Sequence, residues 1–216
     1  MVCKDKVDIA VQAYLSTAST RWKLGNKVLY DLCKEHPEHI DADEIVAKIW
    51  LIGRSYAAAI ERRKNKQSFT GDFYYEKVAP TILSIGGELD LKLQMLKKYQ
   101  CPTNESLGAV LDLHGCLTKT FEVLTAMNKR SLASKYLHFH CPEMFFIYDS
   151  RANKAMRKFV EKGKENLNNY ISADRDMEYT DFCARAMELK DYIYFEYERK
   201  LTPRELDELL LYNNGS

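Results

Sequence analysis

The segment 119–164 holds the residues whose types and spacing suggest chemistry, because it concentrates positive charge. Ten of its residues are basic and four are acidic, so its net charge is +6; the chain totals +1, which leaves −5 for the remainder. Such a segment can be an ordinary solvated face, or it can bind phosphates, where each Lys or Arg contact releases counterions. Its basic residues are Lys119, Lys129, Arg130, Lys135, Arg151, Lys154, Arg157, Lys158, Lys162 and Lys164.

The order of elements inside this segment favours phosphate binding. The stretch 120–127 has a helical pattern, Asn128–Ser131 reads as a short polar turn, and a second helix follows. Pro142 ends that helix, and an apolar connector, 145–148, leads to Asp149 at the start of a third helix. Backbone amides at the start of the second helix can hold a DNA phosphate. A buried connector would fix Asp149 at the rim of a cleft.

These residues resemble the helix-hairpin-helix superfamily of DNA glycosylases (HhH-GPD). In that family a hairpin of the form L-P-G-V-G-x-K-x-A is followed by a helix and by P-x-x-x-x-V-D-x-x-V. Here the matching stretches are 124–134, LTAMNKRSLAS, with one residue more in the turn, and 142–152, PEMFFIYDSRA. The ending D-x-R-A is most similar to the archaeal 8-oxoguanine glycosylase branch.

Two departures from the family pattern bear on the site. Ala126 and Asn128 replace the hairpin glycines; Asn tolerates left-handed backbone angles, so the turn remains possible. The cysteines that hold an iron–sulfur cluster in some members are absent, so the resemblance implies no cofactor for this chain.

The resemblance implies catalytic roles for Asp149 and, in lyase-type members, for a lysine. Asp149 would stabilise the oxocarbenium-like sugar as the base departs and orient the attacking water, although an Asp at a helix start can also serve only as a cap. The family's lysine position falls near Arg130 or Ser131. Lys129, one or two residues earlier, and Lys135, one helical turn later, could each form a Schiff base or contact a phosphate. We favour the phosphate contact for Lys129, and hence a monofunctional enzyme.

The resemblance also implies a DNA surface and a pocket for a flipped base, because the target base must leave the duplex before its glycosidic bond is reached. The expected DNA contacts are Lys129, Arg130, Ser131, Ser134, Arg151 and Lys154. The expected base pocket is lined by His138, His140, Tyr148 and Phe145, with Trp50, Tyr56 and Phe146 as further aromatic candidates. We expect no metal at the His138-x-His140 pair, because residues i and i+2 of a helix diverge.

Helices must position these residues, because Pro and Gly are few and apolar residues recur at helical spacing. The clearest helix spans 42–63, with Asp41 and Glu44 as a capping box at its start. The residues 202–205, TPRE, form a second strong start signal. Further helices are expected at 5–17, 24–35, 74–99 with a bend or break at Gly86-Gly87, 104–127, 130–140, 150–163, 174–199 and 203–212.

The fold class that follows is all-α, resembling the helix-hairpin-helix glycosylases: one helical unit over 1–216, with two lobes around a cleft. A chain of this length buries enough surface to fold without a disulfide or a structural metal. The stretch 64–73 reads as an exposed loop, and 144–148 reads as a buried extended connector. The six cysteines are scattered without a C-x-x-C pair, which indicates reduced thiols.

The setting and the function follow from these features. No apolar run is long enough for a signal peptide or for a membrane span of about 18 residues, so we expect a cytoplasmic protein, and a monomer. Three functions stay open: a DNA glycosylase acting on a damaged or modified base, a non-catalytic helix-hairpin-helix module that binds DNA, and a helical protein–protein scaffold. The sequence does not distinguish oxidised, alkylated and hypermodified phage bases, nor repair from phage defence.

Overall fold

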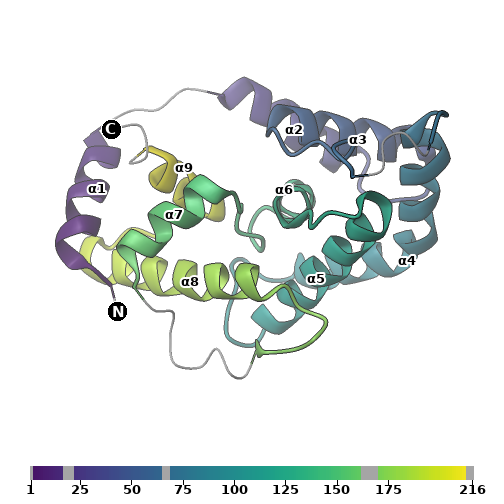
Figure 1. Ribbon diagram of the computed structural model, residues 1–216. Coiled ribbons are helices and arrows are strands. Elements are labelled where there is room, and N and C mark those ends of the chain that lie inside the picture. Colours follow the sequence, from purple (N-terminus) through teal and green to yellow (C-terminus); the bar gives the residue numbers. More distant parts are fainter. Residues whose placement is uncertain (1, 17–21, 65–68, 162–169, 213–216) are drawn as a thin grey trace. The chain divides into compact units, whose positions relative to one another are not determined.

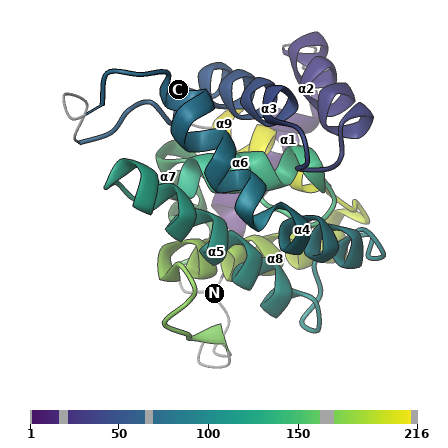
Figure 2. The same cartoon turned by 90° about the vertical axis from the view of Figure 1, so that its right-hand side faces the viewer.

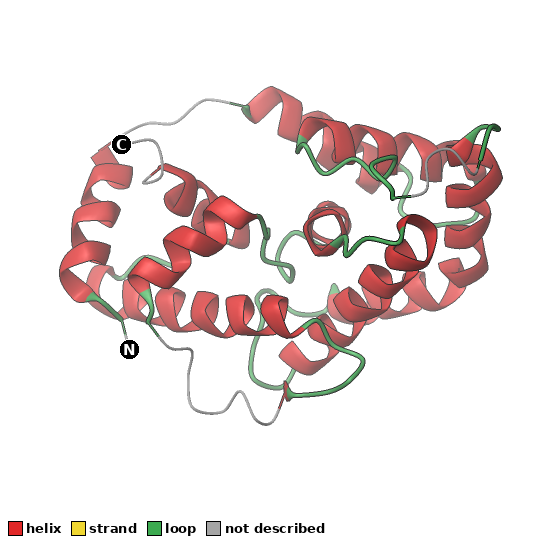
Figure 3. Cartoon of the chain, viewed as in Figure 1, coloured by secondary structure: helices red, strands yellow, loops and turns green. Residues whose placement is uncertain are grey.

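The computed structural model describes residues 2–16, 22–64, 69–161 and 170–212, which are built of helices (Figures 1 and 3). The all-α prediction is confirmed: these ranges contain no strand, and their sole β-type pairing is an isolated bridge between Val2 and Val160. None of the described helices has an apolar stretch of the length that crossing a bilayer requires. The α-helices are α1 (Lys4–Ser16), α2 (Lys23–Glu35), α3 (Ala42–Ser55), α4 (Ala79–Leu96), α5 (Leu107–Thr125), α6 (Arg130–His140), α7 (Ser150–Phe159), α8 (Met177–Tyr197) and α9 (Pro203–Tyr212).

The chain divides into two compact units. The first combines Met1–Arg21 with Phe146–Ser216, and the second is Trp22–Phe145. In the first unit, α7 packs against α1, α8 and α9. The second unit holds α2 to α6 and a π-helical turn, η2 (Tyr74–Val78), that leads into α4. The connector between α6 and α7 passes from one unit to the other.

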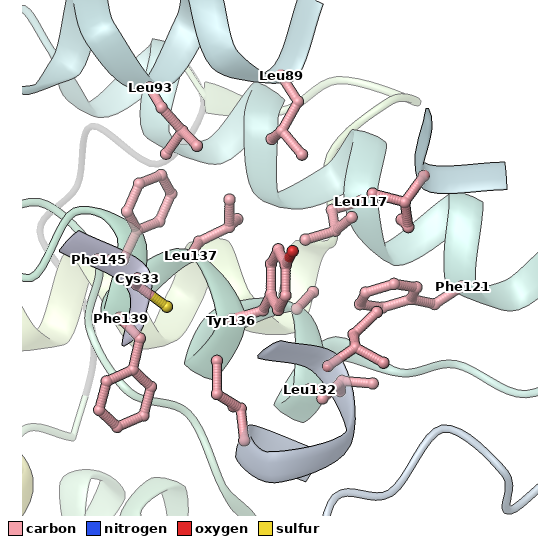
Figure 4. Packing of buried hydrophobic residues seen from close by; sticks show 14 of the residues in the cluster. Cys33, Leu89, Leu93, Leu117, Phe121, Leu132, Tyr136, Leu137, Phe139 and Phe145 are labelled. Atoms are coloured by element: carbon pink, nitrogen blue, oxygen red, sulfur yellow. The ribbon is translucent and has the colours of Figure 1, made fainter. Parts of the chain in front are cut away.

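Helix α6 is the centre of the second unit. It packs against α2, α3 and α5, and it lies between α3 and α5 in both views (Figures 1 and 2). Every residue from Leu132 to His140 is buried. Apolar side chains gather around Tyr136, among them Leu117 and Phe121 of the neighbouring helix α5 (Figure 4). The second helix of the predicted hairpin is therefore also the core of this unit.

The capping box is confirmed at Thr202, whereas at Asp41 only one half of it forms, because the Glu44 carboxylate pairs with His36. Asp41 Oδ1 accepts the Glu44 N–H at 3.0 Å at the start of α3. At the start of α9, Glu205 N–H donates to Thr202 Oγ1 at 3.2 Å, and Thr202 N–H donates to Glu205 Oε2 at 2.8 Å. These bonds satisfy amides that the first helical turn leaves without partners. Each bond joins residues only three positions apart in the sequence.

The helix expected over 42–63 ends earlier, at Ser55. Ala57 has a left-handed backbone, with φ of 52°, and the Ala58 N–H returns to Gly53 O at 2.8 Å. The Ala57 N–H also donates to Arg54 O at 3.3 Å. This pair of bonds is a Schellman motif, which closes a helix end by satisfying its last carbonyls.

The break expected at Gly86-Gly87 is absent, because α4 runs through both residues. A Cβ on Gly86 would lie 2.4 Å from the carbonyl oxygen of His39, whereas a Cβ on Gly87 would meet nothing within 4 Å. Gly86 is therefore required for close packing of the His39 segment on α4. Of the other stretches that the sequence singled out, residues 65–68 of the expected loop and the cations Lys162 and Lys164 lie outside the described ranges.

Candidate nucleic-acid interface

The turn between α5 and α6 is built on a left-handed alanine. Ala126 has φ of 53°, and its N–H donates to Glu122 O at 2.7 Å at the end of α5. Asn128, which tolerates this backbone region better, does not occupy it. Its Oδ1 accepts the Arg130 N–H at 2.9 Å instead. The Arg130 amide, one of those expected to hold a phosphate at the start of α6, therefore already has a hydrogen-bond partner within the turn.

A buried histidine links the two helices of the same hairpin by a hydrogen bond. The Nε2 of His114, on α5, donates to the carbonyl oxygen of Arg130, the first residue of α6, at 3.1 Å. The amide of Lys64 donates to Thr125 O at 3.1 Å, so the chain after α3 also closes on the turn. These contacts hold the two helices of the hairpin in register at the turn.

Lys129 faces the interior of its unit, which corrects both roles expected of it. Its Nζ donates to the carbonyl oxygen of Ala59 at 3.2 Å and to that of Arg62. Burial lowers the pKa of the Lys129 ammonium, and the nearby Arg62 guanidinium lowers it further. An amine committed to two main-chain carbonyls ties the segment 59–62 to the hairpin. It is not presented to a phosphate or to a sugar.

Lys135 lies beside Ser131 on α6, and these two predicted residues do come together. The Nζ of Lys135 donates to Ser131 Oγ at 2.7 Å and lies 5.8 Å from the centroid of the Tyr56 ring. Lys135 is only 1% exposed. Tyr56 is half-buried, and its hydroxyl donates to Asn26 Oδ1 at 2.6 Å. The lysine amine is thus held inside the unit, behind a half-buried tyrosine.

The expected DNA contacts divide by exposure. Arg130 and Ser131 are partly exposed at the start of α6, and Arg151 and Lys154 are exposed on α7. Ser134 is fully buried, and its Oγ donates to Ser131 O at 3.0 Å. This corrects the expectation for Ser134, because a side chain inside the core does not reach a phosphate.

His138 and Phe145, two of the residues expected to line a base pocket, lie in the core of the second unit. The Nδ1 of His138 donates to Phe145 O at 2.8 Å, which leaves its Nε2 to accept from the Tyr30 hydroxyl at 2.6 Å. Both side chains are fully buried. The expectation is corrected for both, because neither ring has a face or an edge open to a base. Of the further aromatic candidates, Trp50 is exposed on α3.

His140 is likewise a core residue, and it belongs to a buried polar cluster that the sequence did not predict. Its ring lies 4.7 Å from that of His39 and 4.8 Å from that of Tyr136, and neither of its nitrogens has a hydrogen-bond partner within the described ranges. The Nδ1 of His39 lies 2.5 Å from Asp90 Oδ1, and its Nε2 accepts from Tyr136 OH at 2.8 Å. Burial lowers the pKa of His39 to about 4, although the hydrogen bond that His39 Nδ1 donates to Asp90 acts in the opposite direction. The cluster is structural, and it excludes His140 from a base pocket.

Asp149 begins α7 as its N-cap residue. Its Oδ1 accepts the N–H groups of Arg151, at 2.9 Å, and of Ala152, at 2.8 Å. Its Oδ2 takes no hydrogen bond in the part of the chain that the structure describes, and the side chain is partly exposed. One oxygen therefore fixes the orientation of the carboxylate, and the second is available to a ligand.

Helix α8 fixes the connector in front of this aspartate. The hydroxyl of Tyr179 donates to Phe146 O at 2.9 Å, and the hydroxyl of Tyr148 donates to Glu178 Oε1 at 2.6 Å. The amide of Asn153, on α7, donates to the same Glu178 oxygen at 3.0 Å. The connector is thus buried, as predicted, and it is non-helical from Phe145 to Tyr148, whereas Met144 lies in a turn. Tyr148 is an anchor of α7 and not the pocket lining that was expected, since its ring is buried.

Comparisons with models of protein families, with curated proteins and with solved structures find no match. The chemistry that the site can perform therefore depends on the side chains described above. The first unit offers an anchored carboxylate at the start of a cationic helix. The second offers a buried amine in a braced hairpin, and in the described ranges no three His, Cys, Asp or Glu side chains gather as metal ligands.

Proposed function

We propose that this protein is a DNA glycosylase that removes a damaged or modified base, with Asp149 as the activating carboxylate. The observation that carries the proposal is the fixed orientation of Asp149, with one oxygen engaged by two amides and Oδ2 available. A preoriented negative charge stabilises the positive charge that develops on the deoxyribose as the base departs, and it needs no reorganisation at that moment.

The reaction that fits these groups is hydrolysis, without a covalent bond to the protein. The N-glycosidic bond breaks, its electron pair leaves with the base, and a water molecule adds to the sugar C1′. Asp149 would orient that water and receive its proton. A covalent route needs a lysine amine that can reach C1′. The amine of Lys129 is held by two carbonyl oxygens, and that of Lys135 is buried against Ser131.

A screen of modified duplexes tests the proposal. Duplexes that carry oxidised, alkylated or hypermodified bases are incubated with the protein and scored for abasic sites by alkaline cleavage. We expect abasic sites on at least one class of modified base, and little covalent adduct when borohydride is present. The absence of abasic sites on all classes would refute the glycosylase. A strong adduct, lost in Lys135→Ala, would instead make the enzyme a lyase.

A non-catalytic DNA-binding module is the second candidate, and the two capping bonds of Asp149 favour it. An aspartate at a helix start is fully accounted for by capping, which stabilises a helix by about 1 kcal/mol. This candidate predicts salt-dependent binding to DNA without any abasic sites in the same screen.

A further inference from the structure

In helix α7 the exposed cations and the buried residues lie on opposite faces. At 100° per residue, its four cations fall within an arc of about 120°, and its buried residues fill about 160° on the opposite side. The exposed cations are Arg151, Lys154, Arg157 and Lys158. The buried residues are Ala152, Asn153, Ala155, Met156 and Phe159, and the helix contains no acidic residue.

Among the described residues, one carboxylate lies against the cationic face of α7. Asp181, on α8, pairs with Arg185 at 2.9 Å and lies 3.7 Å from Arg157. Lys154 and Lys158 have no carboxylate partner within the described ranges. Among the residues that the structure describes, no carboxylate therefore offsets Lys154 or Lys158, and Arg157 shares one carboxylate with Arg185.

We infer that the exposed face of α7, defined by Arg151, Lys154, Arg157 and Lys158, binds the phosphate backbone of duplex DNA and is the main electrostatic surface for it. The inference rests on the proposed function for the identity of the nucleic acid. It adds Arg157 and Lys158 to the interface. It also moves the backbone contact away from the hairpin, where Lys129 is buried.

The length and position of the helix fit this partner. From Arg151 to Lys158 the helix rises about 10 Å, which is about three base-pair steps of duplex DNA. Because the same helix begins at Asp149, a strand that follows the cationic face passes the carboxylate at one end. Backbone binding by α7 would thus bring the sugar of a nucleotide next to the catalytic group.

The test measures how binding to a short, undamaged DNA duplex depends on salt. The variant Lys154→Gln/Lys158→Gln removes two exposed charges that form no ion pair or hydrogen bond with the residues that the structure describes. The matched control, Lys6→Gln/Lys200→Gln, removes two exposed charges from elsewhere in the same unit. We expect the slope of log K against log salt to become shallower by about 2 in the α7 variant, with a loss of affinity of roughly 10- to 60-fold near 0.1 M salt. The control should keep the original slope.

An unchanged slope in the α7 variant, an equal change in the control, or no salt-dependent binding by the unaltered protein would overturn the inference. Abasic-site formation is scored separately on modified duplexes. A shallower slope without any abasic sites would support the α7 surface and reject the glycosylase. Abasic sites with an unchanged slope would support the glycosylase and reject the α7 surface.

Discussion

Replacing Ala126 by glycine should stabilise the protein. A left-handed backbone costs a residue with a Cβ about 1–2 kcal/mol. Glycine avoids this cost, but it loses about 0.5–1 kcal/mol through the greater freedom of the unfolded chain. Ala126 is exposed, so the substitution leaves no cavity. We therefore expect Ala126→Gly to raise the free energy of unfolding by about 0.5–1 kcal/mol.

The assay is urea unfolding followed by circular dichroism, supported by thermal unfolding. For a chain of this size the gain corresponds to a rise of about 1–4 °C in Tm. Ala47→Gly is the matched control, because the same atoms are removed from the right-handed interior of α3. That control should lose about 1 kcal/mol. If Ala126→Gly were destabilising to the same degree as Ala47→Gly, the left-handed turn at the hairpin would be refuted.

Three further predictions concern packing and pH. Gly86→Ala should lower the free energy of unfolding by about 1–3 kcal/mol, because its Cβ meets the His39 carbonyl oxygen. Gly87→Ala should raise the free energy of unfolding by up to about 1 kcal/mol, because its Cβ meets nothing and alanine favours the helix. Urea unfolding of the two variants should show these opposite signs. Lys129→Met should lower the free energy of unfolding by about 1–3 kcal/mol, because it leaves the carbonyl oxygens of Ala59 and Arg62 without their donor. The same change at an exposed lysine of α7 should have little effect on the urea midpoint. Because the pKa of His39 is about 4 in the fold and 6.5 ordinarily, the unfolded chain binds the extra proton between these values. Stability should fall by up to about 3 kcal/mol as pH drops from about 6.5 to about 4, and urea midpoints that are flat or rise over that range would contradict the buried neutral ring.

The sequence predicted what depends on neighbours along the chain. The caps at Asp41 and Thr202 join residues three positions apart, so their signals are contained in four letters. The sequence does not indicate the helix end at Ser55, because the left-handed residue there is an alanine, which has no preference for that region. Gly86 was read as a helix breaker because its real reason, the approach of His39, lies in another segment.

The sequence predicted the positions of candidate site residues correctly only where a charged side chain lies on the surface. Arg151 and Lys154 lie on the surface as expected, and Asp149 starts a helix after a buried connector. Lys129 and His138 were misjudged, because their partners are distant in sequence. Lys129 bonds to a carbonyl 70 residues away, and His138 bonds to a tyrosine 108 residues away. A lysine that satisfies buried carbonyls cannot be told from a surface lysine without those contacts.

The central claim is tested most directly by the rate of base excision in Asp149→Asn, measured under single-turnover conditions on the most responsive duplex. Asparagine caps a helix about as well as aspartate, so the substitution removes the charge and keeps the helix start. The matched control is Asp176→Asn, which makes the same change at the N-cap of α8. We predict that Asp149→Asn loses at least about 100-fold in excision rate, with DNA affinity unchanged and Asp176→Asn fully active. Excision that survives in Asp149→Asn, or that is lost together with DNA binding, would contradict the catalytic role of Asp149.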